Sequence, residues 1–123
     1  MSVTPILFTA TTRPDEARHF YNEVMGFTLT VDSPFSLEYD AAGTMLRVQK
    51  VQELYPHPFT AVGWKVDDIA AERDRLAERG AQFLNFEFME QDERDIWTAP
   101  DGAKVCWFKD PDGNTLSLTE WDG

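Results

Sequence analysis

The side chains that most often do chemistry in proteins are scarce in this chain. It holds two histidines, His19 and His57, and a single cysteine, Cys106. The histidines show no metal-ligand spacing, and Cys106 lies in an apolar stretch with no histidine near it in the sequence. Glu38 and Glu120 are the remaining candidates for acid–base chemistry, although carboxylates at strand ends are usually solvated. We therefore assign no catalytic residue and expect Cys106 to be a buried, inert thiol.

Aromatic side chains indicate ligand binding instead. Phe, Trp and Tyr make up 13% of the chain, with four tryptophans, nine phenylalanines and three tyrosines. A flat organic molecule gains affinity by stacking on such rings and is oriented by hydroxyl groups nearby. Most of the rings belong to the core of any fold, so the elements that position them decide which ones reach a ligand.

A repeat defines those elements. Segments 40–51 and 110–121 align without a gap, each as an Asp-x-x-Gly turn followed by a strand with apolar residues at alternate positions. A repeat of this kind marks a duplicated supersecondary unit. Two glycines, Gly26 and Gly80, follow the expected helices in the two halves and are suited to end them.

Each half of the chain reads as a strand, a helix and three further strands, and the second half includes a predicted strand at 82–89. Strands that precede a helix and then run in succession are typical of an α+β fold with helices on one face of each sheet. We predict a single domain, 1–123, made of two βαβββ modules at 3–51 and 58–121 with a linker at 52–57.

The alternation of side chains along a strand predicts which residues face a ligand. Apolar Leu46 and Leu116 mark the face under the helices, so residues one position away lie on the opposite face. The first strand is apolar at both parities around Ile6, which leaves its assignment open by one residue. The predicted ligand-binding residues, from parity and from the tryptophans of the strand-and-loop framework, are Arg47, Gln49, Phe59, Lys65, Trp97, Trp107, Ser117 and Trp121.

Three motifs resemble those of a known group of proteins: Phe20-Tyr21-x-x-Val24-Met25-Gly26-Phe27, Val66-Asp67-Asp68, and Lys109-Asp110-Pro111-Asp112-Gly113-Asn114. They are similar to motifs of the vicinal oxygen chelate superfamily, which includes glyoxalase I, bleomycin resistance proteins and extradiol dioxygenases. The resemblance covers essentially the whole chain. It implies paired βαβββ modules that form a curved mixed sheet around a cleft, usually in a dimer. It does not fix the function, because this fold serves both metal catalysis and sequestration.

The positions of the metal ligands differ from the family pattern. The resemblance places four ligands near Ile6 and at Arg47, Ala61 and Ser117. Ile and Ala have no lone pair to donate, a guanidinium repels a cation, and a serine hydroxyl is a weak ligand. We therefore predict no metal at these positions and no cofactor.

Three functions stay open beside a degenerate member of the family with no small ligand, and the chain is not assigned firmly as an enzyme. The first is a metal-independent protein of the bleomycin-resistance type that sequesters an aromatic or amphiphilic small molecule, with antibiotic resistance as one role. The second is a metal-free enzyme in which Arg47 or Lys65 stabilises an anionic intermediate. The third, a metal-dependent lyase, isomerase or dioxygenase, is disfavoured by Arg47 and Ala61.

Charge and hydropathy limit the partners. The net charge is −11, which disfavours nucleic acid and anionic membranes. No signal peptide or membrane span is recognisable, so we expect a cytoplasmic protein. Sheet edges that need cover predict a homodimer.

Overall fold

The computed structural model describes residues 2–122 and contains two successive sets of strands and helices. The first set is β1 Ile6–Thr11, α1 Pro14–His19, the π-helical turn η1 Phe20–Val24, β2 Thr28–Asp32, β3 Ser36–Ala41 and β4 Thr44–Lys50. The second set is β5 Thr60–Lys65, α2 Ile69–Glu78, β6 Trp97–Thr98, β7 Lys104–Lys109 and β8 Thr115–Glu120.

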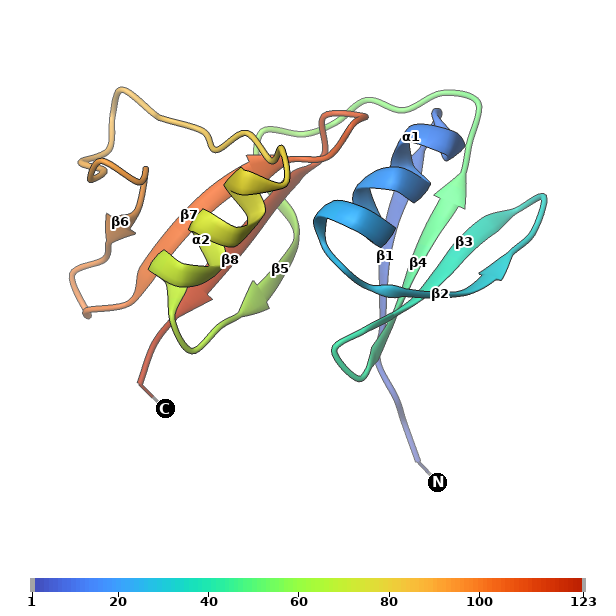
Figure 1. Cartoon of the computed structure of the whole chain (residues 1–123), viewed down its shortest axis with the longest axis horizontal. Helices are drawn as coiled ribbons and strands as arrows, with labels where there is room; N and C mark the ends of the chain where they lie inside the picture. The colour runs from blue at the N-terminus through green and yellow to red at the C-terminus, as the bar shows by residue number, and fades with distance from the viewer. Residues whose placement is uncertain (1, 123) are drawn as a thin grey trace.

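The strands form two four-stranded mixed sheets with the same topology. Their orders are β1-β4-β3-β2 and β5-β8-β7-β6. The first strand of each set pairs in parallel with the last, and the remaining pairs are antiparallel. Figure 1 shows the sheets side by side, with α1 and α2 next to each other on the same side of them. The α+β fold of two similar modules is thereby confirmed.

The repeat seen in the sequence corresponds to equivalent places in the two sheets. Leu46 of β4 lies between Leu7 and Tyr39, and Leu116 of β8 lies between Val62 and Phe108. Both leucines are completely buried under the helices. Gly26 and Gly80 follow the helical segments with φ angles of +77° and +108°, a conformation that favours glycine.

The core lies between the helices and the sheets and joins the two modules. The rings of Phe20 in η1 and Phe108 in β7 are 6.4 Å apart. The Tyr21 hydroxyl donates a 2.7 Å hydrogen bond to Asp110 Oδ2 in the turn before β8. Asn114 of the same turn donates its amide to the carbonyl of Ala10 in β1. The aspartates of the 109–114 motif therefore lie at the junction of the modules.

The strand predicted at 82–89 is wrong, because the structure has only a turn and one isolated bridge there, between Phe83 and Phe108. The side chain of Gln91 replaces the missing ladder. Its Oε1 accepts a 2.6 Å hydrogen bond from the Phe86 amide, while its Nε2 donates to the carbonyls of Leu84 and Asp95. Such a side chain satisfies backbone groups that a strand partner would otherwise satisfy.

Within residues 2–122, no helix combines the length and the apolar character that crossing a membrane requires.

Candidate functional site

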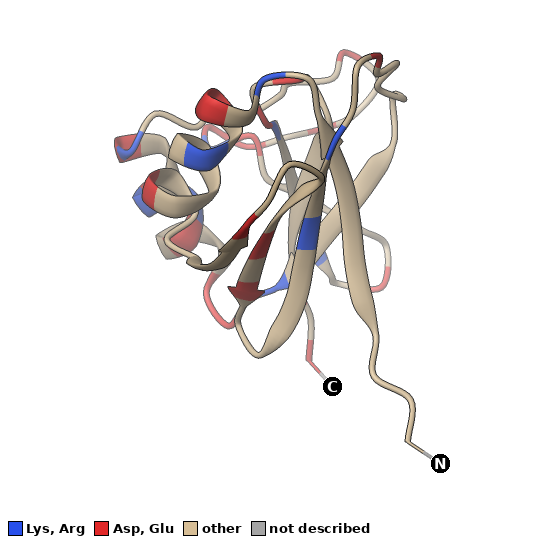
Figure 2. Cartoon of the chain, turned by 90° about the vertical axis from the view of Figure 1, so that its right-hand side faces the viewer, with Lys and Arg blue, Asp and Glu red and all other residues tan. Residues whose placement is uncertain are grey.

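The sheet face opposite the helices carries most of the predicted ligand-binding residues, and we call it the helix-free face. In β4 the exposure alternates, with Leu46 and Val48 buried while Met45 and Gln49 are exposed. Figure 2 shows the helices on one side of the strands, with acidic and basic residues concentrated on helices and loops. Much of the sheet is uncharged, so a charged residue on its helix-free face stands out.

In the first module this face is built around Arg47. The guanidinium carbon of Arg47 lies 5.8 Å from the ring centroid of Phe8, and Arg47 Nη2 is 3.7 Å from Glu38 Oε2. Arg47 Nε is buried and has no hydrogen-bond partner in the structure. Gln49, two residues along β4, is exposed and lies opposite Ser36 and Ala10. Arg47 is thus a half-buried cation with unused hydrogen-bonding capacity.

In the second module the face is built around Trp107. Its indole Nε1 donates a 3.1 Å hydrogen bond to the hydroxyl of Thr60, and its ring centroid is 6.2 Å from that of Trp97. Ser117 lies between Trp107 and Gly63 in the sheet. A Cβ at Gly63 would come within 2.5 Å of Ser117 Oγ, so the serine hydroxyl occupies the space over the glycine. That hydroxyl has no hydrogen-bond partner among residues 2–122.

A β-bulge in β5 changes which residues reach this face. Thr60 pairs with Thr115 and Val62 with Leu116, so Ala61 is the extra residue of the bulge. Phe59 lies just before the strand and stacks on His57, with ring centroids 5.1 Å apart. Sequence parity therefore missed Thr60, because a single inserted residue reverses the alternation before it.

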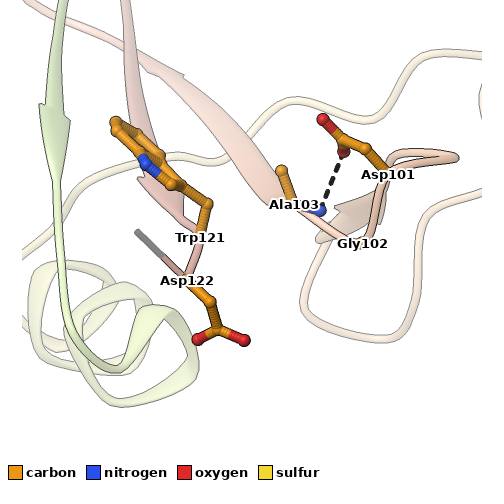
Figure 3. Close-up of a pocket in the computed structure, with 5 residues that line it drawn as sticks. All are labelled: Asp101, Gly102, Ala103, Trp121 and Asp122. Atoms are coloured by element: carbon orange, nitrogen blue, oxygen red, sulfur yellow. Dashed lines mark hydrogen bonds between the residues drawn. The ribbon is translucent and has the colours of Figure 1, made fainter.

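Trp121 and Lys65, both in the predicted set, lie together at the far end of the sheet. Lys65 Nζ is 4.7 Å from the centroid of the Trp121 ring. Trp121 also lines a pocket of about 430 Å³ with Asp101, Gly102, Ala103 and Asp122. Figure 3 shows that the Asp101 and Asp122 carboxylates point away from each other. The pocket is therefore poorly arranged to hold a cation between two carboxylates.

The structure does not gather the whole predicted set into one pocket. Trp121 lines the pocket beside Asp101, whereas Trp97 lines a different one with Gln91 and Ile96. Arg47 and Ser117 lie on β4 and β8, and strands β1 and β5 intervene between them. Within one chain, the helix-free face therefore carries two separate groups of residues. We call the group around Arg47 the Arg47 region and the group around Trp107 the Trp107 region.

The residues that face each other at the family's ligand positions do not suit a metal ion. In register, Phe8 lies beside Arg47 and Gly63 lies beside Ser117, in place of the expected Ile6 and Ala61. We call these four residues the row at the family's ligand positions. They offer a phenyl ring, a guanidinium, a glycine and a hydroxyl, and such a set does not bind a divalent metal. Among the described residues, no group of three or more His, Cys, Asp or Glu is placed to hold one.

Two further chemical candidates from the sequence, Glu120 and Cys106, have structural roles. Glu120 Oε1 accepts a 3.0 Å hydrogen bond from the backbone amide of Ile69 at the start of α2. Cys106 is fully buried, and burial raises the pKa of its thiol to about 12. A thiol with that pKa is a poor nucleophile at neutral pH.

Comparison with known proteins gives the family to which this chain belongs. The profile of the Glyoxalase/Bleomycin resistance protein/Dioxygenase superfamily matches residues 6–118. The chain is a member of that superfamily, which confirms the resemblance seen in its motifs. A search of curated proteins gave no match.

Several solved structures share the fold. A member from Sphaerobacter thermophilus DSM 20745 is 22% identical with a TM-score of 0.77, over 98% of each chain. Lactoylglutathione lyase from Agrobacterium tumefaciens is 17% identical with a TM-score of 0.74, over 98% of this chain and 94% of its own. TioX from Micromonospora sp. ML1 is 20% identical with a TM-score of 0.71, over 97% of this chain and 98% of its own. Identities this low establish the fold alone.

Proposed function

We propose that this protein is a metal-independent binding protein that sequesters a planar organic molecule against the helix-free face of its second module. The observation that carries the proposal is the arrangement around Trp107. An indole held in place by Thr60 lies beside a second indole, Trp97, and next to the unpartnered hydroxyl of Ser117. Rings provide stacking surface and the hydroxyl provides orientation.

The charge on this part of the face supports a neutral or anionic ligand. By alternation along β5 and β7, Lys65 and Lys109 belong to the helix-free face, whereas Glu120 at the end of β8 turns to the helix side and caps α2. Although the whole chain carries a net charge of −11, exposed charges beyond about 10 Å are screened in ordinary salt. The local lysines therefore weigh more than the distant acidic residues.

The row at the family's ligand positions supports a metal-independent mode of binding. Its donors are the Arg47 guanidinium and the Ser117 hydroxyl, neither of which attracts a divalent cation. We expect elemental analysis of the purified protein to give far less than one zinc, nickel or iron per chain. About one equivalent, lost when Ser117 is changed, would contradict this part of the proposal.

A second candidate function is a metal-free enzyme, and one observation favours it. Arg47 Nε is buried without a partner, and a half-buried guanidinium of this kind stabilises negative charge that develops on a substrate. NMR spectra of each bound compound, followed over hours, separate the two functions. A sequestering protein returns the compound unchanged, and an enzyme converts it with a rate that falls when Arg47 is replaced by Gln.

We further propose a homodimer, with the first module's helix-free face as part of the interface. This face exposes Ile6, Phe8 and Met45, with exposed fractions of 40%, 48% and 36%. Apolar side chains that lie together on one sheet face lose contact with water when a second copy covers them.

The binding proposal is tested by calorimetric titration with a panel of planar aromatic compounds that are neutral, anionic or cationic. We expect at least one compound to bind, and replacement of Trp107 by Leu to weaken its binding by about 1–3 kcal/mol, the value of a large aromatic contact. Trp121→Ala is the matched variant at the other end of the sheet, and it tests our prediction that Trp121 belongs to the same site. A panel in which no compound binds would refute the proposed function.

A further inference from the structure

A small pocket opens at the end of the helix-free face of the second module, where the linker meets the sheet. Its volume is about 280 Å³, close to the lower limit for small-molecule sites, so it holds part of a ligand rather than a whole one. Three segments line it: Pro56, His57 and Pro58 between β4 and β5, Leu84, Asn85 and Phe86 of the loop before β6, and Lys109, Gly113 and Thr115.

The polar groups of this pocket have capacity to spare. Thr115 is only 5% exposed, and its hydroxyl finds no hydrogen-bond partner in the described part of the chain. Lys109 pairs with Thr115 across β7 and β8, and it forms no ion pair within residues 2–122. The Thr115 hydroxyl is therefore available to donate a hydrogen bond to a ligand.

The carboxylates closest to Lys109 in the sequence are already engaged elsewhere. Asp110 accepts hydrogen bonds from Tyr21 and Asn114 on the helix side of the sheet. Asp112 accepts hydrogen bonds from the hydroxyls of Thr11 and Thr12. The ammonium of Lys109 therefore keeps its charge available for a ligand.

The apolar wall of the pocket connects it to the Trp107 region. Phe86 lines the pocket and also packs edge-to-face against Trp107, with ring centroids 5.6 Å apart and an interplanar angle of 81°. On the opposite wall, Pro56 lies over Gly113, with a closest approach of 3.5 Å to a Cβ built on the glycine. A planar ring on Trp107 thus has a polar, lysine-bearing pocket at its edge.

We propose that the ligand is a planar aromatic acid whose carboxylate enters this pocket and is held by Lys109 and Thr115, while its ring lies against Phe86 and Trp107. This inference rests on the proposed function and names the class of ligand. A carboxylate accepts a charge-assisted hydrogen bond from the lysine and an ordinary one from the threonine hydroxyl. A neutral carboxamide of the same shape accepts weaker hydrogen bonds from both groups and lacks the charge pairing with the lysine.

The test compares 2-naphthoate with its neutral counterpart 2-naphthamide by calorimetry at low salt. We expect the parent protein to bind naphthoate more tightly. Lys109→Gln should weaken naphthoate binding about three- to tenfold, the range for an exposed lysine that bonds to a carboxylate, and should weaken naphthamide binding less. Lys104→Gln removes the same charge from the opposite face of β7 and should change neither affinity. Thr115→Val, which keeps the shape of the side chain, should weaken naphthoate by about two- to tenfold.

Equal affinities for naphthoate and naphthamide in the parent would overturn the inference, as would equal effects of the two lysine substitutions. If naphthoate fails to bind while neutral or cationic members of the panel bind in a Trp107-dependent way, the inference is wrong and the proposed function stands. If no planar compound binds, both are wrong.

Discussion

Two buried tyrosines offer a matched test of what joins the modules. Tyr21 is fully buried, and its hydroxyl donates a 2.7 Å hydrogen bond to Asp110 across the module junction. Tyr39 is 1% exposed, and its hydroxyl is buried without a hydrogen-bond partner in the structure. Their ring centroids are 5.8 Å apart, so both side chains lie in the same part of the core. Replacement by Phe removes one oxygen from each and keeps the ring.

The expected effects differ in sign. Tyr21→Phe removes a bond to a buried carboxylate, which costs about 1.5–3 kcal/mol of unfolding free energy. In the variant, Asp110 still accepts hydrogen bonds from the Asn114 side-chain amide and from two backbone amides. We therefore expect Tyr21→Phe to lower the unfolding free energy by about 2 kcal/mol. Tyr39→Phe removes an unpaired polar group and should be neutral or stabilise the protein by about 1 kcal/mol.

Urea unfolding followed by circular dichroism measures both changes, and equal m-values for parent and variants show that the unfolded states are comparable. The reasoning fails if Tyr39→Phe costs as much as Tyr21→Phe, because the loss would then arise from the ring environment and not from the hydrogen bond.

Three further predictions concern titration, reactivity and assembly. Burial raises the pKa of the Asp110 carboxyl in the folded protein above its ordinary value of 3.8. The contribution of Asp110 to stability is therefore greatest at acid pH and is lost as the pH rises through the raised pKa. The Tyr21 hydrogen bond lowers that pKa, so the cost of Tyr21→Phe should shrink as the pH is lowered; unfolding at a series of pH values checks this, and a pH-independent cost would contradict it. Cys106, with its thiol pKa at about 12, should not react with an aromatic disulfide reagent until the protein is unfolded, and rapid labelling of the native protein would disprove its burial. Sedimentation at micromolar concentration should show a dimer that Phe8→Glu converts to monomer, and a monomeric parent would count against the interface.

The sequence predicted the parts of the fold that depend on local pattern. The repeat around Leu46 and Leu116, the helices ended by Gly26 and Gly80, and the direction of Arg47 all follow from alternation and glycine placement. These features need no information about distant residues, because period and backbone conformation are properties of the segment itself.

The parts that sequence reasoning missed depend on contacts between distant residues. The segment 82–89 alternates like a strand, but the side chain of Gln91 satisfies its backbone groups. The bulge at Ala61 is visible only in the pairing of β5 with β8, and it brings Thr60 to Trp107. Likewise, the pocket at Thr115 forms because the linker folds over the sheet, which no local pattern indicates.

The central claim is that a planar ligand binds at Trp107 on the helix-free face, and the indole N–H resonances of the four tryptophans test it most directly. Trp107 lies in the proposed site, whereas Trp64 packs against Phe27 on the helix side, with ring centroids 5.3 Å apart, and serves as the internal reference. Titration of ¹⁵N-labelled protein with the tightest-binding planar compound should shift the Trp107 resonance, whose N–H is bonded to Thr60, and leave that of Trp64 in place. A saturable shift at Trp64 with none at Trp107 would place the ligand on the other side of the sheet and contradict the account.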